Sequence, residues 1–201
     1  GEASVKADAA LKATTLDLNK LDVAQNGQMT ATGALTVGDL TNEGTLFAKT
    51  LNVTDGTSKN GSLTADVLNV AGSFELGDNT KLGEASVKAD AALKATTLNL
   101  NKLDVAQNGQ MTATGALTVG DLTNEGTLSA KTLNVTDGTS KNGSLTADVL
   151  NVAGSFELGD NTKLGEASVK ADAALKATTL NLNKLDVAQN GQMTATGALT
   201  V

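Results

Sequence analysis

The sequence predicts an all-β chain wound as a parallel β-helix, a β-solenoid with about 17 residues in each coil. Three observations predict this fold. Apolar residues recur at every second position over short stretches, which is the period of a β-strand. The short pattern returns after 17 or 18 residues, and a larger unit of 82 residues recurs almost unchanged. Because one pattern cannot bury its own apolar face, stacked copies are needed to form a core.

The pattern is clearest in residues 44–60, GTLFAKTLNVTDGTSKN, and in residues 61–77, GSLTADVLNVAGSFELG. Both share the skeleton Gly-x-Leu-x-Ala-x-x-Leu-x-Val. Alternation directs Leu46 and Ala48 to one face of a first short strand, and Leu51 to the same interior from a second strand after a bend. Each such stretch is therefore expected to form one coil.

Four coils follow in order, at 9–26, 27–43, 44–60 and 61–77. One residue inserted near Gly33 predicts a β-bulge. Most coils add a third apolar pair, so we expect three short strands per coil, joined by bends. The inward residues expected in the first two coils, and in the third strand of the fourth, are Leu11, Ala13, Leu16, Leu18, Leu21, Val23, Met29, Ala31, Leu35, Val37, Leu40, Phe74 and Leu76.

Residues 78–90, DNTKLGEASVKAD, fit this layout less well. Leu82, Ala85, Val87 and Ala89 are expected to supply a shorter coil, whose register the pattern leaves open. Counting it as a coil gives five coils in each 82-residue repeat. At about 4.8 Å between paired strands, one repeat then advances roughly 24 Å and the chain makes a rod of roughly 60 Å.

Equivalent residues of successive coils are expected to lie above one another. Leucine and methionine are expected to fill the centre, and alanine to let the walls approach closely. The two expected columns are Leu11, Met29, Leu46 and Leu63, and Ala13, Ala31, Ala48 and Ala65.

The chain divides into repeat 1 (1–82), repeat 2 (83–164) and a partial repeat 3 (165–201), expected to form one continuous solenoid within a longer array. Both positions at which the repeats differ lie between inward residues, so both are expected to face outward, where substitution costs little. The differences are Asp17 to Asn99 and Asn181, and Phe47 to Ser129.

Composition excludes several classes of function. The net charge of −7 opposes binding to duplex nucleic acid, which needs a basic face, and aromatic platforms for single strands are missing. No apolar run approaches the roughly 18 residues that span a bilayer. The absence of Cys excludes disulfides and thiolate zinc sites.

Strings such as GALTVGDLTNEGTL and GSLTADVLNVAGSF resemble the repetitive tracts of bacterial surface β-solenoids, namely autotransporter passengers, filamentous-haemagglutinin-like adhesins and related extracellular fibre proteins. The resemblance covers the whole chain. It implies a right-handed solenoid, export from a bacterium, and a role as a stalk, adhesin or fibre subunit. It carries over no functional residue.

Parallel β-helices also include polysaccharide-degrading enzymes, so carboxylate pairs are the candidates for acid–base chemistry. The pairs are Asp17 with Asp22, Asp39 with Glu43, and Asp66 with Glu75. Asp17 is Asn in the other copies, and no His, Arg or Tyr is present to bind a sugar. A solvated surface is therefore the favoured interpretation, and no catalytic residue is assigned.

Two oxygen-rich loops, 55–57 and 77–80, resemble calcium loops only superficially, because Asp, Asn and Gly also suit tight turns. No metal or cofactor site is assigned. Lys49 and Asp66 occupy equivalent positions of adjacent coils and are expected to form an exposed ion pair. The pair Thr30 and Thr32 suggests an ice-binding ladder, but the equivalent positions of other coils hold Lys, Phe and Asp, which breaks it.

We therefore expect a structural, non-catalytic filament or adhesin stalk at the bacterial cell surface, with itself as the main partner through end-to-end or lateral association. Other surfaces would be contacted through domains outside this chain. The alternative is a glycan- or protein-binding repeat acting by avidity. A polysaccharide-degrading enzyme and a cross-β amyloid fibre are further alternatives.

Overall fold

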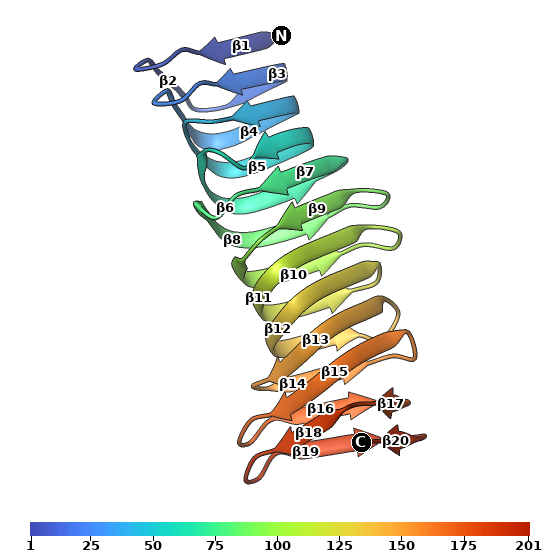
Figure 1. Ribbon diagram of the computed structural model, residues 1–201. Coiled ribbons are helices and arrows are strands. Elements are labelled where there is room, and N and C mark those ends of the chain that lie inside the picture. The colour runs from blue at the N-terminus through green and yellow to red at the C-terminus, as the bar shows by residue number, and fades with distance from the viewer.

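The computed structural model describes residues 1–201 as an all-β chain without a helix, wound into stacked coils (Figure 1). Coils of about 18 residues follow one another for about 11 turns, and the strands of neighbouring coils pair in parallel. The predicted β-solenoid is confirmed. Its strands are β1 (Glu2–Val5), β2 (Ala10–Ala13), β3 (Leu16–Val23), β4 (Gln28–Asn42), β5 (Thr45–Ser58), β6 (Ser62–Val70), β7 (Ser73–Leu76), β8 (Thr80–Val87), β9 (Ala92–Ala95), β10 (Leu98–Val105), β11 (Gln110–Asn124), β12 (Thr127–Ser140), β13 (Ser144–Val152), β14 (Ser155–Leu158), β15 (Thr162–Val169), β16 (Ala174–Ala177), β17 (Leu180–Asn181), β18 (Lys184–Val187), β19 (Gln192–Ala195) and β20 (Leu199–Thr200).

The inward residues form one core that runs along the axis. Its 50 buried residues make a single cluster, so the repeats are parts of one continuous solenoid. Leu, Val and Ala supply nearly all of it, and Phe74 and Phe156 are its aromatic members. The interior is therefore mainly aliphatic.

The predicted stacking register is confirmed. Each residue of the column Leu11, Met29, Leu46 and Leu63 pairs with the next, and so does each residue of the column Ala13, Ala31, Ala48 and Ala65. The register between β4 and β5 shifts between Ala31 and Ala34, so the inserted residue near Gly33 forms the predicted bulge.

Residues 78–90 do not form the shorter coil expected from the sequence. Strand β8 pairs along β6 in regular register, with Thr80 beside Leu63 and Ala85 beside Leu68. The sequence pattern hides this register because Thr80 stands where the preceding coils have leucine or methionine.

Three columns of inward residues define three sides of the solenoid. Long strands bend around the corners, so that β4 alone contributes Met29, Leu35 and Leu40 to three different columns. Column A begins Leu11, Met29, Leu46 and Leu63; column B begins Leu16, Leu35, Leu51 and Leu68; column C begins Ala3, Leu21, Leu40, Gly56 and Phe74.

The 82-residue repeat does not fill a whole number of coils. Column C reaches Leu93, the second copy of Leu11, four coils after Leu21. Column B reaches Leu103, the second copy of Leu21, five coils after Leu16. A residue and its copy in the next repeat therefore lie in neighbouring columns, not in the same column. The repeat spans about four and two-thirds coils, where five were expected.

The shift turns each repeat by about one third of a circle relative to the last. At about 4.8 Å per coil, one repeat advances roughly 22 Å. Phe47 is 39% exposed and faces outward on the side of column A. Its copy in the second repeat, Ser129, is next to Leu128 and therefore lies on the side of column C. Asp17 is exposed as well, so the predicted outward orientation of both variable positions is confirmed.

Two tight turns recur in every repeat and join one coil to the next. Asp8 and Asn26 have φ angles of 60° and 64°, a left-handed conformation that Asp and Asn adopt more readily than most residues. The turns close through Ala9 N donating to Lys6 O and Gly27 N donating to Ala24 O. The positions recur at Asp90, Asn108, Asp172 and Asn190.

Candidate functional site

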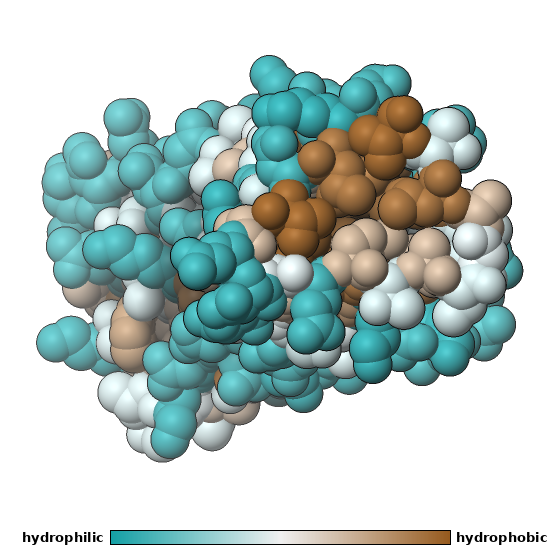
Figure 2. Space-filling view, turned by 90° about the horizontal axis from the view of Figure 1, so that it is seen from below, coloured by the Kyte–Doolittle hydropathy of each residue, from teal (hydrophilic) through white to brown (hydrophobic).

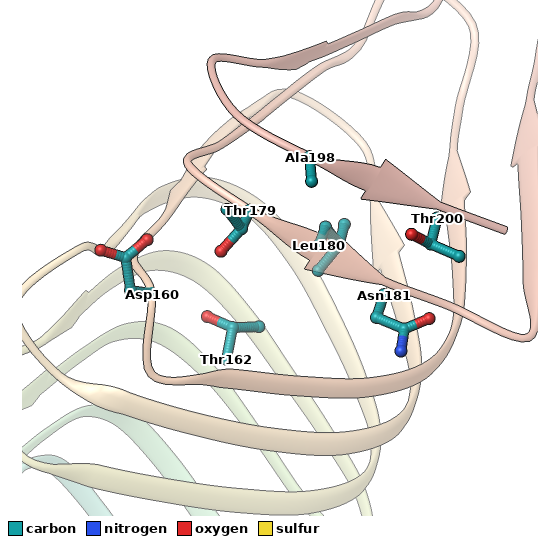
Figure 3. A pocket seen from close by; sticks show the side chains of 7 residues that line it. All are labelled: Asp160, Thr162, Thr179, Leu180, Asn181, Ala198 and Thr200. Atoms are coloured by element: carbon teal, nitrogen blue, oxygen red, sulfur yellow. The ribbon is translucent and has the colours of Figure 1, made fainter.

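A polar groove lies near the C-terminal end, where column C passes from β15 to β17 (Figure 3). Asp160, Thr162 and Thr179 turn oxygen atoms toward one another across it. Its volume of about 210 Å³ is below the roughly 300 to 1,000 Å³ of typical small-molecule sites. The groove offers hydrogen-bonding groups but no basic or aromatic side chain. It is lined by Asp160, Thr162, Thr179, Leu180, Asn181, Ala198 and Thr200.

A second kind of groove recurs where one repeat meets the next. It has a volume of about 210 Å³ around Lys59 and Glu75, and about 160 Å³ around their copies Lys141 and Glu157. In each copy the lysine and glutamate form a 3.2 Å ion pair between adjacent coils. The first copy is lined by Lys59, Glu75, Leu76, Lys94, Ala95, Thr96, Thr112 and Thr114. These groups can bind a polar ligand by hydrogen bonds.

The carboxylate pairs predicted from the sequence are distributed over the surface. Asp17 lies over column B and Asp22 over column C, so a corner of the coil separates them. Asp22 forms a 3.4 Å ion pair with Lys20. Asp39 lies in register between Lys20 of the preceding coil and Asp55 of the next coil, whereas Glu43 follows the end of β4.

The expected ion pair between Lys49 and Asp66 is not among the five ion pairs of the molecule. The two residues occupy matching places in the paired strands β5 and β6, so the register prediction holds while the contact prediction is wrong. Glu75, the expected acid–base partner of Asp66, instead forms the ion pair with Lys59.

Charged side chains are stacked on the outside of the coils. Glu84, Lys102 and Asp121 follow one another in register across three strands. Lys102 also lies 3.1 Å from Asp104. The hydrogen bond from Lys102 to Asp104 and the attraction of that carboxylate raise the pKa of Lys102 above 10.5, and Glu84 and Asp121 add to the shift. Opposite charges therefore lie side by side on neighbouring strands, which favours the observed register.

The two calcium-like loops have structural roles. Asp55 Oδ1 accepts a 2.7 Å hydrogen bond from Ser73 N of the next coil. Thr80 Oγ1 donates a 2.8 Å bond to Gly77 O. No group of three or more His, Cys, Asp or Glu side chains is arranged to hold a metal ion.

The outward row that suggests an ice-binding ladder is chemically mixed. Lys12, Thr30, Phe47, Thr64 and Lys81 follow one another in register, so lysine and phenylalanine interrupt the threonines, as the sequence predicts.

A buried polar cluster was missed by the sequence analysis. Asn42 Nδ2 donates to Ser58 Oγ at 2.8 Å and to Ser62 O at 3.0 Å, while Asn42 Oδ1 has no hydrogen-bond partner. The cluster recurs around Asn124. One signal points to it, because Asn42 follows Leu40 at the two-residue period of inward positions.

No protein-family model matches the chain, and neither curated proteins nor solved structures provide a similar protein. The structure has no helix that is both long and apolar enough to cross a membrane. The features that bear on function are therefore those of the solenoid itself.

Proposed function

We propose that the chain is a structural, non-catalytic rod that acts as a rigid filament or adhesin stalk. The observation that supports the proposal is the continuous parallel ladder, which joins each coil to the next through backbone hydrogen bonds along the axis. The single aliphatic core inside the ladder resists bending, since each coil within the stack packs against both neighbours.

The rotation between repeats also supports a spacer. A feature on one side of a repeat returns on another side in the next, about one third of a turn away. A flat partner surface would meet the same residues only in every third repeat. A rod that presents similar residues on each of its sides is suited to act as a spacer along its axis.

The same proposal places the protein outside a bacterial cell and lets the rods associate with one another. Excess negative charge on the exterior, −7 for the chain, would keep neighbouring rods apart laterally. Association through the two ends then extends the rod without adding lateral contacts.

The test is a length series. Chains of two, three and four repeats should increase in length by roughly 22 Å per repeat, measured by electron microscopy and small-angle X-ray scattering. A cross-section that grows with repeat number while the length stays constant would contradict the rod.

The second candidate, an adhesin repeat acting by avidity, is supported by the recurrent groove around Lys59 and Lys141. Glycan-array binding that rises with repeat number, and that is lost with Lys59→Ala and Lys141→Ala together, would favour it. A matched pair of variants outside the groove, Lys49→Ala with Lys131→Ala, should leave such binding unchanged.

A further inference from the structure

Five Asn-Gly sequences lie in short loops between strands, and the structure holds them in two different ways. Asn-Gly is the sequence in which asparagine deamidates most readily, because glycine has no side chain to shield its backbone nitrogen. Each of the five asparagines is exposed to water, and hydrophilic residues cover most of the face that Figure 2 shows. The five asparagines are Asn26, Asn60, Asn108, Asn142 and Asn190.

Three of the five are held in a closed turn. Asn26 has a φ angle of 64°, and its copies Asn108 and Asn190 have φ angles of 64° and 61°. In each turn the glycine N–H donates a hydrogen bond to the carbonyl oxygen three residues earlier, as Gly27 N does to Ala24 O at 2.8 Å. Because deamidation begins with attack by this nitrogen on the asparagine side chain, the turn has to open before the reaction can start.

The other two asparagines, Asn60 and Asn142, are not held in this way. They lie between β5 and β6 and between β12 and β13, and neither has a positive φ angle. Neither Gly61 N nor Gly143 N donates a hydrogen bond. Asn60 also lines a groove of about 230 Å³, and Asn142 lines its copy of about 210 Å³, so there is open space beside each side chain.

We propose that Asn60 and Asn142 are self-modification sites, at which the folded chain deamidates while Asn26 and its copies keep their amides. Gly61 N gives up its proton to water and attacks the side-chain carbonyl carbon of Asn60. A bond forms between these two atoms, the bond from that carbon to Nδ2 breaks, and Nδ2 takes up a proton and leaves as ammonia. Water then opens the resulting succinimide ring at either carbonyl, which gives aspartate or isoaspartate.

The modification acts at a closely packed corner of the coil. Ser62 N donates to Gly44 O at 2.8 Å, and Ser62 O accepts from Asn42 Nδ2 at 3.0 Å. A Cβ atom on Gly61 would meet Asn42 O at 2.6 Å, so the corner has no spare room. Isoaspartate inserts one more carbon into the backbone before Gly61 and should therefore weaken these bonds between coils. Each event also adds one negative charge to a chain of formal charge −7.

The test compares the five sites within one protein. The 201-residue chain is kept folded in mildly alkaline buffer, and a second sample is kept unfolded in urea, before digestion under mildly acidic conditions and mass spectrometry. Trypsin cleaves after Lys59 and Lys141, so Asn60 and Asn142 lie in peptides of one sequence, separate from the peptides of the turn asparagines. The fraction of the unfolded rate that the folded chain retains should be at least about tenfold higher at Asn60 and Asn142 than at Asn26 and its copies.

The double variant Asn60→Gln, Asn142→Gln is the matched control, because glutamine keeps an exposed amide but forms a cyclic imide much more slowly. Thermal melting before incubation checks that the variant folds. The variant should lose the gain of negative charge that ion-exchange chromatography detects in the incubated wild type. The incubated wild type should also melt at a lower temperature than the incubated variant.

Deamidation in the folded chain that is as fast at Asn26 and its copies as at Asn60 and Asn142, each relative to its unfolded rate, would overturn the proposal. Intact amides at all five sites, after the unfolded sample has reacted, would overturn it as well. Equal melting temperatures of the modified wild type and the variant would contradict the effect on packing between coils. None of these outcomes bears on the proposed rod, which is tested by its length.

Discussion

At the scale of single residues, the close approach of two coils depends on one glycine. Gly56 lies in column C between Leu40 and Phe74, with a φ angle of 138°. A Cβ atom there would approach the Leu40 backbone oxygen to 2.0 Å. The arrangement recurs at Gly138, beneath Phe156. The glycine accepts a backbone conformation that other residues rarely adopt, and its missing Cβ lets the strand lie close to the Leu40 backbone.

We expect Gly56→Ala to lower the free energy of unfolding by on the order of 2–3 kcal/mol, because it combines backbone strain with a steric conflict. Chemical denaturation measures the change. Gly1→Ala, where a Cβ meets no atom within 4 Å, is the control. A Gly56→Ala protein as stable as that control would show that the strand does not adopt this conformation.

The two phenylalanines of the first repeat should respond oppositely to truncation. Phe74 is 1% exposed, so Phe74→Ala should cost about 3–5 kcal/mol through lost burial and the cavity left behind. Phe47→Ser should stay within about 0.5 kcal/mol, since the position is exposed and already holds Ser129 in the second copy. Equal losses for both variants in the same denaturation assay would contradict the assignment of inward and outward positions.

At the scale of strands, charged residues on the outer face support the pairing of coils. The Lys102 ammonium in β10 is favoured in the folded state by its hydrogen bond to Asp104. Because folding raises the pKa of Lys102, its stabilising contribution is complete below the unfolded pKa of about 10.4 and is lost as pH rises through the folded pKa. Because the Lys102 side chain is exposed, its contribution to the free energy of unfolding is small. The pKa of Lys102 is therefore the better quantity to measure.

Asp104→Asn should bring the pKa of Lys102 back toward 10.5, measured by NMR titration of the lysine side chain. Lys184, whose pKa is raised in the same way by Asp186, is an internal control and should keep its raised pKa. If the Lys102 titration is the same with and without Asp104, the contact between the two is not formed in solution.

Sequence periodicity predicts the strand elements well and the spacing of the repeat less well. The alternation of apolar and polar residues correctly identifies Leu46 and Ala48 as inward positions, because inward and outward positions differ in polarity. The interruption of the same alternation locates the bulge near Gly33. It leaves β8 unplaced, since Thr80 interrupts the leucine column. Candidate sites are harder to predict. Side-chain contacts such as the one between Lys59 and Glu75 depend on reach across coils, which register alone does not determine.

At the scale of the whole molecule, the mismatch between sequence repeat and coil decides how the surface is presented. Five coils per repeat would align every copy of a residue on one side. The observed third of a turn distributes copies over all three sides. A residue type that recurs in each repeat is therefore presented on a different side in each copy, in agreement with the proposed role as a spacer.

The rotation is tested most directly by disulfide formation. The chain has no native cysteine, so any disulfide that forms must join the two introduced cysteines. Glu75 and Lys94 face outward as neighbours on paired strands, at a separation of about 4.8 Å that a disulfide can span. The double variant Glu75→Cys, Lys94→Cys should therefore form an intramolecular disulfide on mild oxidation, detected by mass spectrometry. Lys81→Cys, Lys94→Cys should stay reduced, because Lys81 lies over column A and Lys94 over column C. The opposite result, a disulfide between positions 81 and 94 and none between 75 and 94, would contradict the rotation.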